Sequence, residues 1–164
     1  MGVMTDYFRA ADAAVVRRVL EAADGGSPLL GPQRALDGVE AKGLDPTVVL
    51  GQLVAAVRQV PWAVDLVGDT PVWPATPPPG RDGPEDEDDP WLTGPWVFEL
   101  DAGTRDTLAA IPDEDIPAVA ARWARAEELH GASAESLCPV VGDLAGLARR
   151  ARVAGDLLYC WTCL

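Results

Sequence analysis

The sequence predicts an α+β fold that is mainly helical, with about five helices and a small sheet formed by the N- and C-terminal strands. Apolar residues recur at helical spacing before residue 61 and after residue 96. Short runs rich in aromatic and branched residues stand at the two ends, at residues 2–9 and 156–164. The chain has 164 residues, the usual size of one domain, so we expect residues 1–164 to form a single domain.

The first third of the chain reads as a strand, a helix and a weakly patterned connection. Residues 2–9 are expected to form the strand. Asp12 then caps a helix over residues 13–23, because a carboxylate there accepts hydrogen bonds from the free N–H groups of the first turn. The expected apolar stripe of this helix consists of Val15, Val19 and Ala22 or Ala23. A short strand or turn is expected around residues 36–41.

The clearest helix start is Asp45-Pro46, which places a capping residue before a proline at the first helical position. This helix runs to residue 60 and is apolar on several sides, so we expect it to lie in the core. A brief extended piece is predicted at residues 97–100. Asp101 then caps a helix over residues 102–111.

Two more helices and a strand are predicted for the last third of the chain. The acidic residues 113–115 suit the positive end of a helix dipole and begin a helix that Gly131 closes. Pro139 is expected to open the last helix and Gly155 to end it. Residues 156–164 read as the closing strand.

Residues 61–96 lack any such periodicity and form the most unusual part of the chain. The segment contains four of the six tryptophans, a run of three prolines and the acidic run 85–89. We interpret it as a long ordered loop that aromatic rings hold at both ends and that carries a solvated acidic tip. The residues expected to bind a partner are Trp73, Glu85, Asp86, Glu87, Asp88, Asp89 and Trp91. The four tryptophans could form a binding groove, but we favour the interpretation in which they fold back and attach the loop to the core.

The net charge of −13 limits the classes of partner. It argues against nucleic acid, whose phosphates require a basic face, and against anionic membrane surfaces. It permits a basic protein partner, because opposite charges accelerate association. The sequence has no signal-peptide pattern, no apolar run of about 20 residues and three cysteines, which predicts reduced thiols and a cytoplasmic location.

The sharpest local pattern is Cys160-x-x-Cys163 at the chain end. Such a pair can bind zinc or work as a redox dithiol, and a zinc site would also use Cys138 and His130. Residues three apart on an extended strand, however, point to opposite faces, so the two sulfurs would not meet. We therefore interpret the cysteines as small apolar residues. His130, next to Gly131, is expected to stabilise a helix end through the helix dipole.

The chain resembles the YfbM-like family of small bacterial proteins. The resemblance lies in the aromatic pair Tyr7-Phe8 on a first strand, the helix started by Asp12, the late helix with Leu108 and Ile111, and the strand after Gly155. It covers residues 1–23 and 92–164. The Pro- and acid-rich middle and the terminal Cys-Trp-Thr-Cys depart from the pattern. The family has no established activity, so the resemblance implies no functional residue.

These observations predict a soluble, non-enzymatic interaction protein, of the immunity or regulatory kind, that binds a basic partner through its acidic, tryptophan-anchored loop. We predict no catalytic residue and no cofactor, because the sequence holds no Walker loop, no GxGxxG after a strand, no GxSxG and no HExxH. Two alternatives remain open. One is a small metal- or thiol-dependent protein that uses Cys160 and Cys163, and the other is an enzyme with a Trp-lined pocket for a small molecule.

Overall fold

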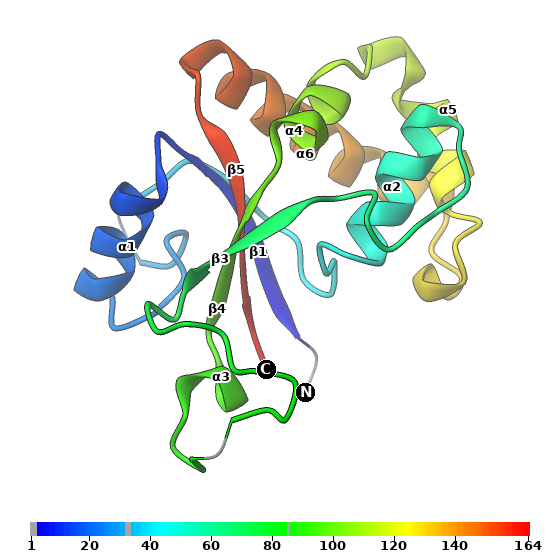
Figure 1. Cartoon of the computed structure of the whole chain (residues 1–164). Helices are drawn as coiled ribbons and strands as arrows, with labels where there is room; N and C mark the ends of the chain where they lie inside the picture. Colours follow the sequence, from blue (N-terminus) through cyan, green and yellow to red (C-terminus); the bar gives the residue numbers. More distant parts are fainter. Residues whose placement is uncertain (1–2, 32–33, 85) are drawn as a thin grey trace.

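A five-stranded antiparallel sheet runs through the middle of the molecule (Figure 1). The computed structural model describes residues 3–31, 34–84 and 86–164. The strand order is β2-β1-β5-β4-β3. The strands are β1 (Met4–Ala10), β2 (Gly38–Glu40), β3 (Asp69–Trp73), β4 (Trp96–Leu100) and β5 (Leu157–Cys163). β1 pairs with β5 along its whole length, from Met4↔Cys163 to Ala10↔Leu157, which confirms that the two predicted terminal strands lie side by side.

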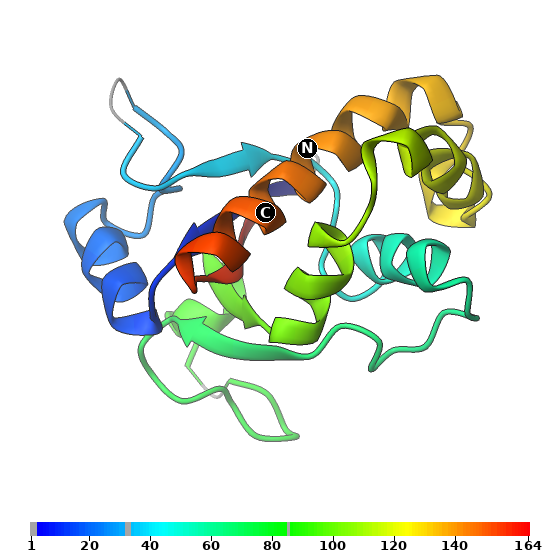
Figure 2. The ribbon, with the colours of Figure 1, turned by 90° about the horizontal axis from the view of Figure 1, so that it is seen from above.

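Helices cover both faces of the sheet, but unequally. α1 (Ala13–Ala22) lies on one face, whereas α2 (Val49–Arg58), α4 (Ala102–Ala109), α5 (Ile116–Trp123) and α6 (Ala134–Ala154) lie on the other. Seen from above, α6 crosses over the sheet (Figure 2). The four-residue α3 (Pro90–Thr93) stands apart, and 3₁₀ turns occupy Asp113–Asp115 and Glu127–Leu129. Among the described residues, no helix has the length and apolar character needed to cross a membrane.

Side-chain alternation along the strands produces two apolar cores, one on each face of the sheet. Tyr7 and Cys160 point into the larger core beneath α2, α4, α5 and α6. Their neighbours Phe8 and Tyr159 point into the smaller core beneath α1, where their rings stack with centroids 5.7 Å apart. The sheet therefore separates a large packed layer from a thin one.

The α+β class is confirmed, but two details of the prediction are wrong. The protein is not mainly helical, since six α-helices accompany five strands in the described residues, and the sheet uses more than the terminal strands. β3 falls inside the segment 61–96 that we expected to be irregular. Pro71 interrupts the β-pattern there, yet β3 is an edge strand, which tolerates a residue without an N–H.

Three helix boundaries also differ from the prediction. Asp45 does accept from the N–H of Val48 at 2.7 Å, but α2 begins only at Val49. α5 ends at Trp123, well before Gly131. α6 begins at Ala134 with Ser133 as its capping residue, so Pro139 lies inside the helix and does not open it. The Ser133 hydroxyl provides the capping acceptor that proline cannot, and it receives the N–H of Ser136 at 3.1 Å.

The prediction of which α1 residues are buried needs the correction with the largest consequence. Of the predicted stripe, Val15 packs half-buried against the smaller core, Val19 is half-buried, and Ala22 and Ala23 are exposed. The fully buried positions of the helix are Val16 and Leu20, which are 0% exposed. The helix therefore has two adjacent apolar stripes, and only one of them is covered by the sheet.

Candidate functional site

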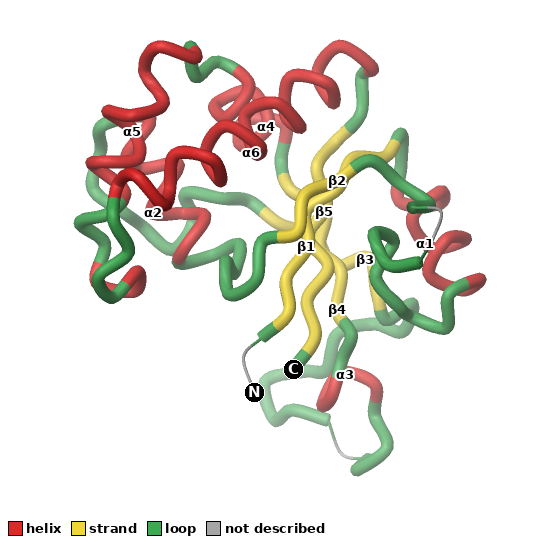
Figure 3. The backbone as a smooth tube through the Cα atoms, turned by 180° about the vertical axis from the view of Figure 1, so that it is seen from behind, coloured by secondary structure: helices red, strands yellow, loops and turns green. Residues whose placement is uncertain are grey.

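The acidic loop, which we define as residues 74–89, connects β3 to α3 and extends beyond the end of the sheet (Figure 3). Two indole groups hold its base. Trp91 donates its Nε1–H to the backbone oxygen of Thr76 at 3.2 Å and lies 3.1 Å from the Thr76 hydroxyl. Trp96 in turn donates its Nε1–H to the backbone oxygen of Trp91 at 3.2 Å. The start and the end of the loop are thus attached to each other by side-chain contacts.

Four described carboxylates of the acidic loop are exposed, namely Asp82 and three of the acidic run. Asp86, Glu87 and Asp88 are exposed, and none forms an ion pair with an arginine or lysine in the part of the chain that the structure describes. Asp89 has a structural role, because its carboxylate accepts from the N–H of Trp91 at 2.8 Å and caps α3. Glu85 lies outside the described residues.

Trp73, which we expected to contact a partner, lies half-buried against the smaller core. A Cβ at Gly25 would lie 3.0 Å from Cγ of Pro95 and 3.6 Å from Nε1 of Trp73, so the turn after α1 packs closely against this region. Trp91 is also half-buried. Both residues thus pack as the favoured interpretation of the tryptophans expects, while their contact with a partner stays a prediction.

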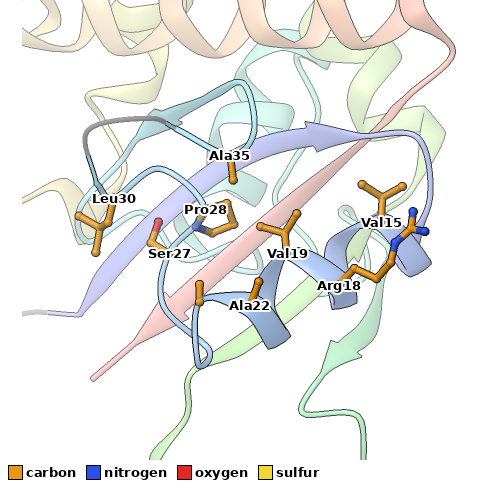
Figure 4. Close-up of a pocket in the computed structure, with 9 residues that line it drawn as sticks. Val15, Arg18, Val19, Ala22, Ser27, Pro28, Leu30 and Ala35 are labelled. Carbon is orange, nitrogen blue, oxygen red and sulfur yellow. The ribbon is translucent and has the colours of Figure 1, made fainter.

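An apolar groove lies between α1 and the connection that follows it (Figure 4). Its volume is about 490 Å³. One wall is the second stripe of α1, and Figure 4 shows Val15 and Val19 pointing into the space between the helix and the connection. The other wall includes Ser27, Pro28, Leu30 and Ala35, and among the described lining residues Arg18 is the one that carries a charge.

The sequence analysis did not predict this groove, although the apolar residues that line it on α1 were visible in the sequence. Residues 15–23 carry more apolar positions than one buried stripe requires, and the set that we assigned to the core omits Val16 and Leu20. The hydroxyl of Ser27, one of the lining residues, donates to the carboxylate of Asp6. Burial raises the pKa of Asp6, and the bond from Ser27 and the charge of Arg34 oppose that shift while Glu40 adds to it. A buried polar pair therefore fixes the position of Ser27 in the lining of the groove.

The structure separates the residues of the candidate zinc or thiol site. Cys160 is buried in the larger core, whereas Cys163 packs against the smaller core on the other face of the sheet. Cys138 lies on α6, and His130 has a left-handed backbone after the turn Glu127–Leu129. Burial raises the pKa of the Cys160 thiol, which keeps it protonated. Within the described ranges, no three His, Cys, Asp or Glu side chains lie close enough to share a metal ion.

Comparison of the chain with protein-family models, with curated proteins and with solved structures gave no significant match. The resemblance to the YfbM-like family therefore stays a prediction.

Proposed function

We propose that this chain is a non-enzymatic interaction protein that binds a basic partner protein through its acidic loop. The observation that carries the proposal is the state of Asp86, Glu87 and Asp88: they are exposed on a loop whose base is fixed, and no described cation of the chain neutralises them. Unpaired carboxylates on an ordered projection attract a basic surface and lose little conformational freedom when they bind it.

The distribution of the arginines supports the same proposal. Arg9, Arg34, Arg105, Arg149 and Arg150 form ion pairs with carboxylates elsewhere in the chain. These pairs, with the second bond of Arg9, involve Asp37, Glu40, Asp106, Asp113 and Asp156, and none of the described carboxylates of the acidic loop. Because the three cysteines are free thiols, we also propose a reducing, cytoplasmic location.

The proposal is tested with two matched triple variants. The loop variant D86N/E87Q/D88N removes three negative charges from the tip. The control variant E127Q/E128Q/E135Q removes three exposed charges near the other end of the molecule, so the net charge changes equally. Affinity-tagged forms of both and of the wild type are incubated with lysate of the source cells at low salt, and bound proteins are identified by mass spectrometry.

We expect a basic protein that the wild type and the control variant retain and the loop variant loses. Its binding should weaken as salt is raised, because salt screens contacts between exposed charges. Equal retention by the loop and control variants would show that binding depends on net charge alone or on another surface. That result would contradict the proposal.

A further inference from the structure

A second pocket lies between α2 and α5. These two helices lie away from the acidic loop (Figure 1). Its volume is about 310 Å³, near the lower end of the range for small-molecule sites. The residues that matter for its chemistry are Gln52, Gln59, Trp62, Arg122 and Arg125. A chain with 26 acidic and 13 basic residues thus places two arginines and two amides around one hollow.

The two arginines form no ion pair with any carboxylate that the structure describes. Arg122 donates its Nε–H to the backbone oxygen of Ala56 at 2.9 Å, which fixes the guanidinium beside the last turn of α2. In the described part of the chain, neither Arg122 nor Arg125 forms an ion pair. The fork of N–H groups on a guanidinium matches the oxygens of a carboxylate or phosphate. Glu127 and Glu128 line an adjoining hollow with the same arginines but form no ion pair with them. The two guanidinium groups therefore remain available to a bound anion.

The orientation of Trp62 is also fixed. Its Nε1–H donates to the backbone oxygen of Thr47 at 3.1 Å, and the ring packs on Gly51, where a Cβ would lie only 2.7 Å from Nε1. The side chain nevertheless stays 37% exposed and lines the pocket. A fixed, exposed indole beside two cations provides a flat apolar surface for the body of a small molecule.

We propose that this pocket binds a small organic anion, whose carboxylate or phosphate group contacts Arg122 and Arg125 and whose apolar part lies against Trp62. The inference goes beyond the proposed function, since it concerns other residues and another class of ligand. Gln52 and Gln59 supply amide groups for further polar atoms of the ligand.

The proposal is tested by NMR titrations of ¹⁵N-labelled protein in Tris chloride buffer. The signals followed are those of the tryptophan indole N–H groups and of the arginine Nε–H groups. The probes are benzoate, phenyl phosphate and the neutral benzyl alcohol, which share an aromatic ring and differ in the head group. Arg125→Gln removes one cation of the pocket. Arg152→Gln removes an exposed cation of α6 and is the matched control.

We expect saturable shifts of the Trp62 indole signal and of the Arg122 and Arg125 Nε signals with at least one of the two anions, and no saturation with benzyl alcohol. The anion that binds more tightly identifies the preferred head group. The affinity should fall at least tenfold in Arg125→Gln and stay unchanged in Arg152→Gln. Shifts that do not saturate with either anion, or an equal loss in the two variants, would overturn the proposal.

Discussion

Arg9 bridges two carboxylates that come from distant parts of the chain. Its Nε donates to Oδ2 of Asp37 at 2.7 Å, and its Nη1 donates to Oδ2 of Asp156 at 2.7 Å. Arg150 of α6 binds Asp37 as well, with its Nε 2.8 Å from Oδ2 and its Nη2 3.0 Å from Oδ1. These bonds join β1, the segment before β2, the end of α6 and the residue that precedes β5.

The first prediction concerns the pH dependence of this ion-pair cluster. The hydrogen bond from Arg150, and to a smaller extent that from Arg9, lowers the pKa of Asp37 from 3.8 to about 2. Because the folded pKa is below the unfolded one, the stabilisation is present above pH 3.8 and is lost as the pH falls toward 2. The Asp37 side chain is 35% exposed, so solvent screening limits the contribution to about 1 kcal/mol.

Urea unfolding of the wild type and Asp37→Asn at several pH values measures this contribution. At pH 7 the variant should be less stable by about 1 kcal/mol, and the difference should shrink steadily below pH 4. Glu40→Gln, which removes a more exposed ion pair with Arg34, is the control and should change stability by less. A difference for Asp37→Asn that keeps its full size at pH 2 would exclude this role of the charge.

The second prediction separates the two apolar stripes of α1. Val16 is fully buried against the sheet, while Val15 lines the groove. Val16→Ala should lower the free energy of unfolding by about 2 kcal/mol, because it removes two buried methyl groups and leaves a cavity. Val15→Ala should cost less than about 1 kcal/mol, since its methyl groups are already partly in water. Equal losses in chemical denaturation would mean that the groove is closed in solution.

These two stripes also show how far the sequence could predict the fold. Asp12 and Asp101 were assigned as helix caps correctly, because capping depends on a local bond: Asp12 accepts from Val15 N–H at 2.9 Å and Asp101 from Thr104 N–H at 2.8 Å. Which stripe of α1 is buried depends instead on where the sheet lies, and the sheet is assembled from segments more than 100 residues apart. Helical periodicity carries no such information when both stripes are apolar.

The difference between local features and contacts across the chain also decides which candidate sites the sequence could predict. The acidic loop was visible in the sequence because proline, tryptophan and acid runs are local features. The pocket of Arg122 and Arg125 was not, since it joins α5 to Gln52 and Trp62 from a part of the chain about 60 to 70 residues earlier. The opposite orientation of Cys160 and Cys163 was predicted correctly from strand geometry alone.

The third prediction concerns the base of the acidic loop. Trp91→Phe keeps an aromatic ring but removes the N–H that Thr76 accepts. Loss of one partly exposed hydrogen bond should change global stability by about 1 kcal/mol or less. Hydrogen exchange of the amides in residues 76–89 should nevertheless become faster, because local opening no longer has to break this bond.

Trp62→Phe is the matched control for this experiment. It removes a similar indole bond, to the backbone oxygen of Thr47, and should leave exchange in the acidic loop unchanged. Hydrogen–deuterium exchange followed by mass spectrometry measures both variants. Exchange in residues 76–89 that stays at the wild-type rate in Trp91→Phe would show that other contacts order the loop.

The last prediction tests the thiol chemistry that the pattern Cys160-x-x-Cys163 permits. In the folded protein Cys160 is 0% exposed, and its raised pKa keeps the reactive thiolate rare, whereas Cys163 is half-buried on the other face of the sheet. Iodoacetamide should therefore modify Cys163 rapidly and Cys160 only after unfolding in urea. Mass spectrometry of the digested protein measures the modification of each cysteine.

Diamide oxidation extends the same test to disulfide formation. A disulfide requires Cβ atoms about 4 Å apart, and side chains on opposite faces of a strand cannot reach that distance without breaking the pairing of β5 with β1 and β4. We therefore expect a Cys160–Cys163 disulfide in urea and none in the native protein. Its formation under native conditions would mean that β5 opens at its end, and it would favour the thiol-dependent alternative over the interaction protein.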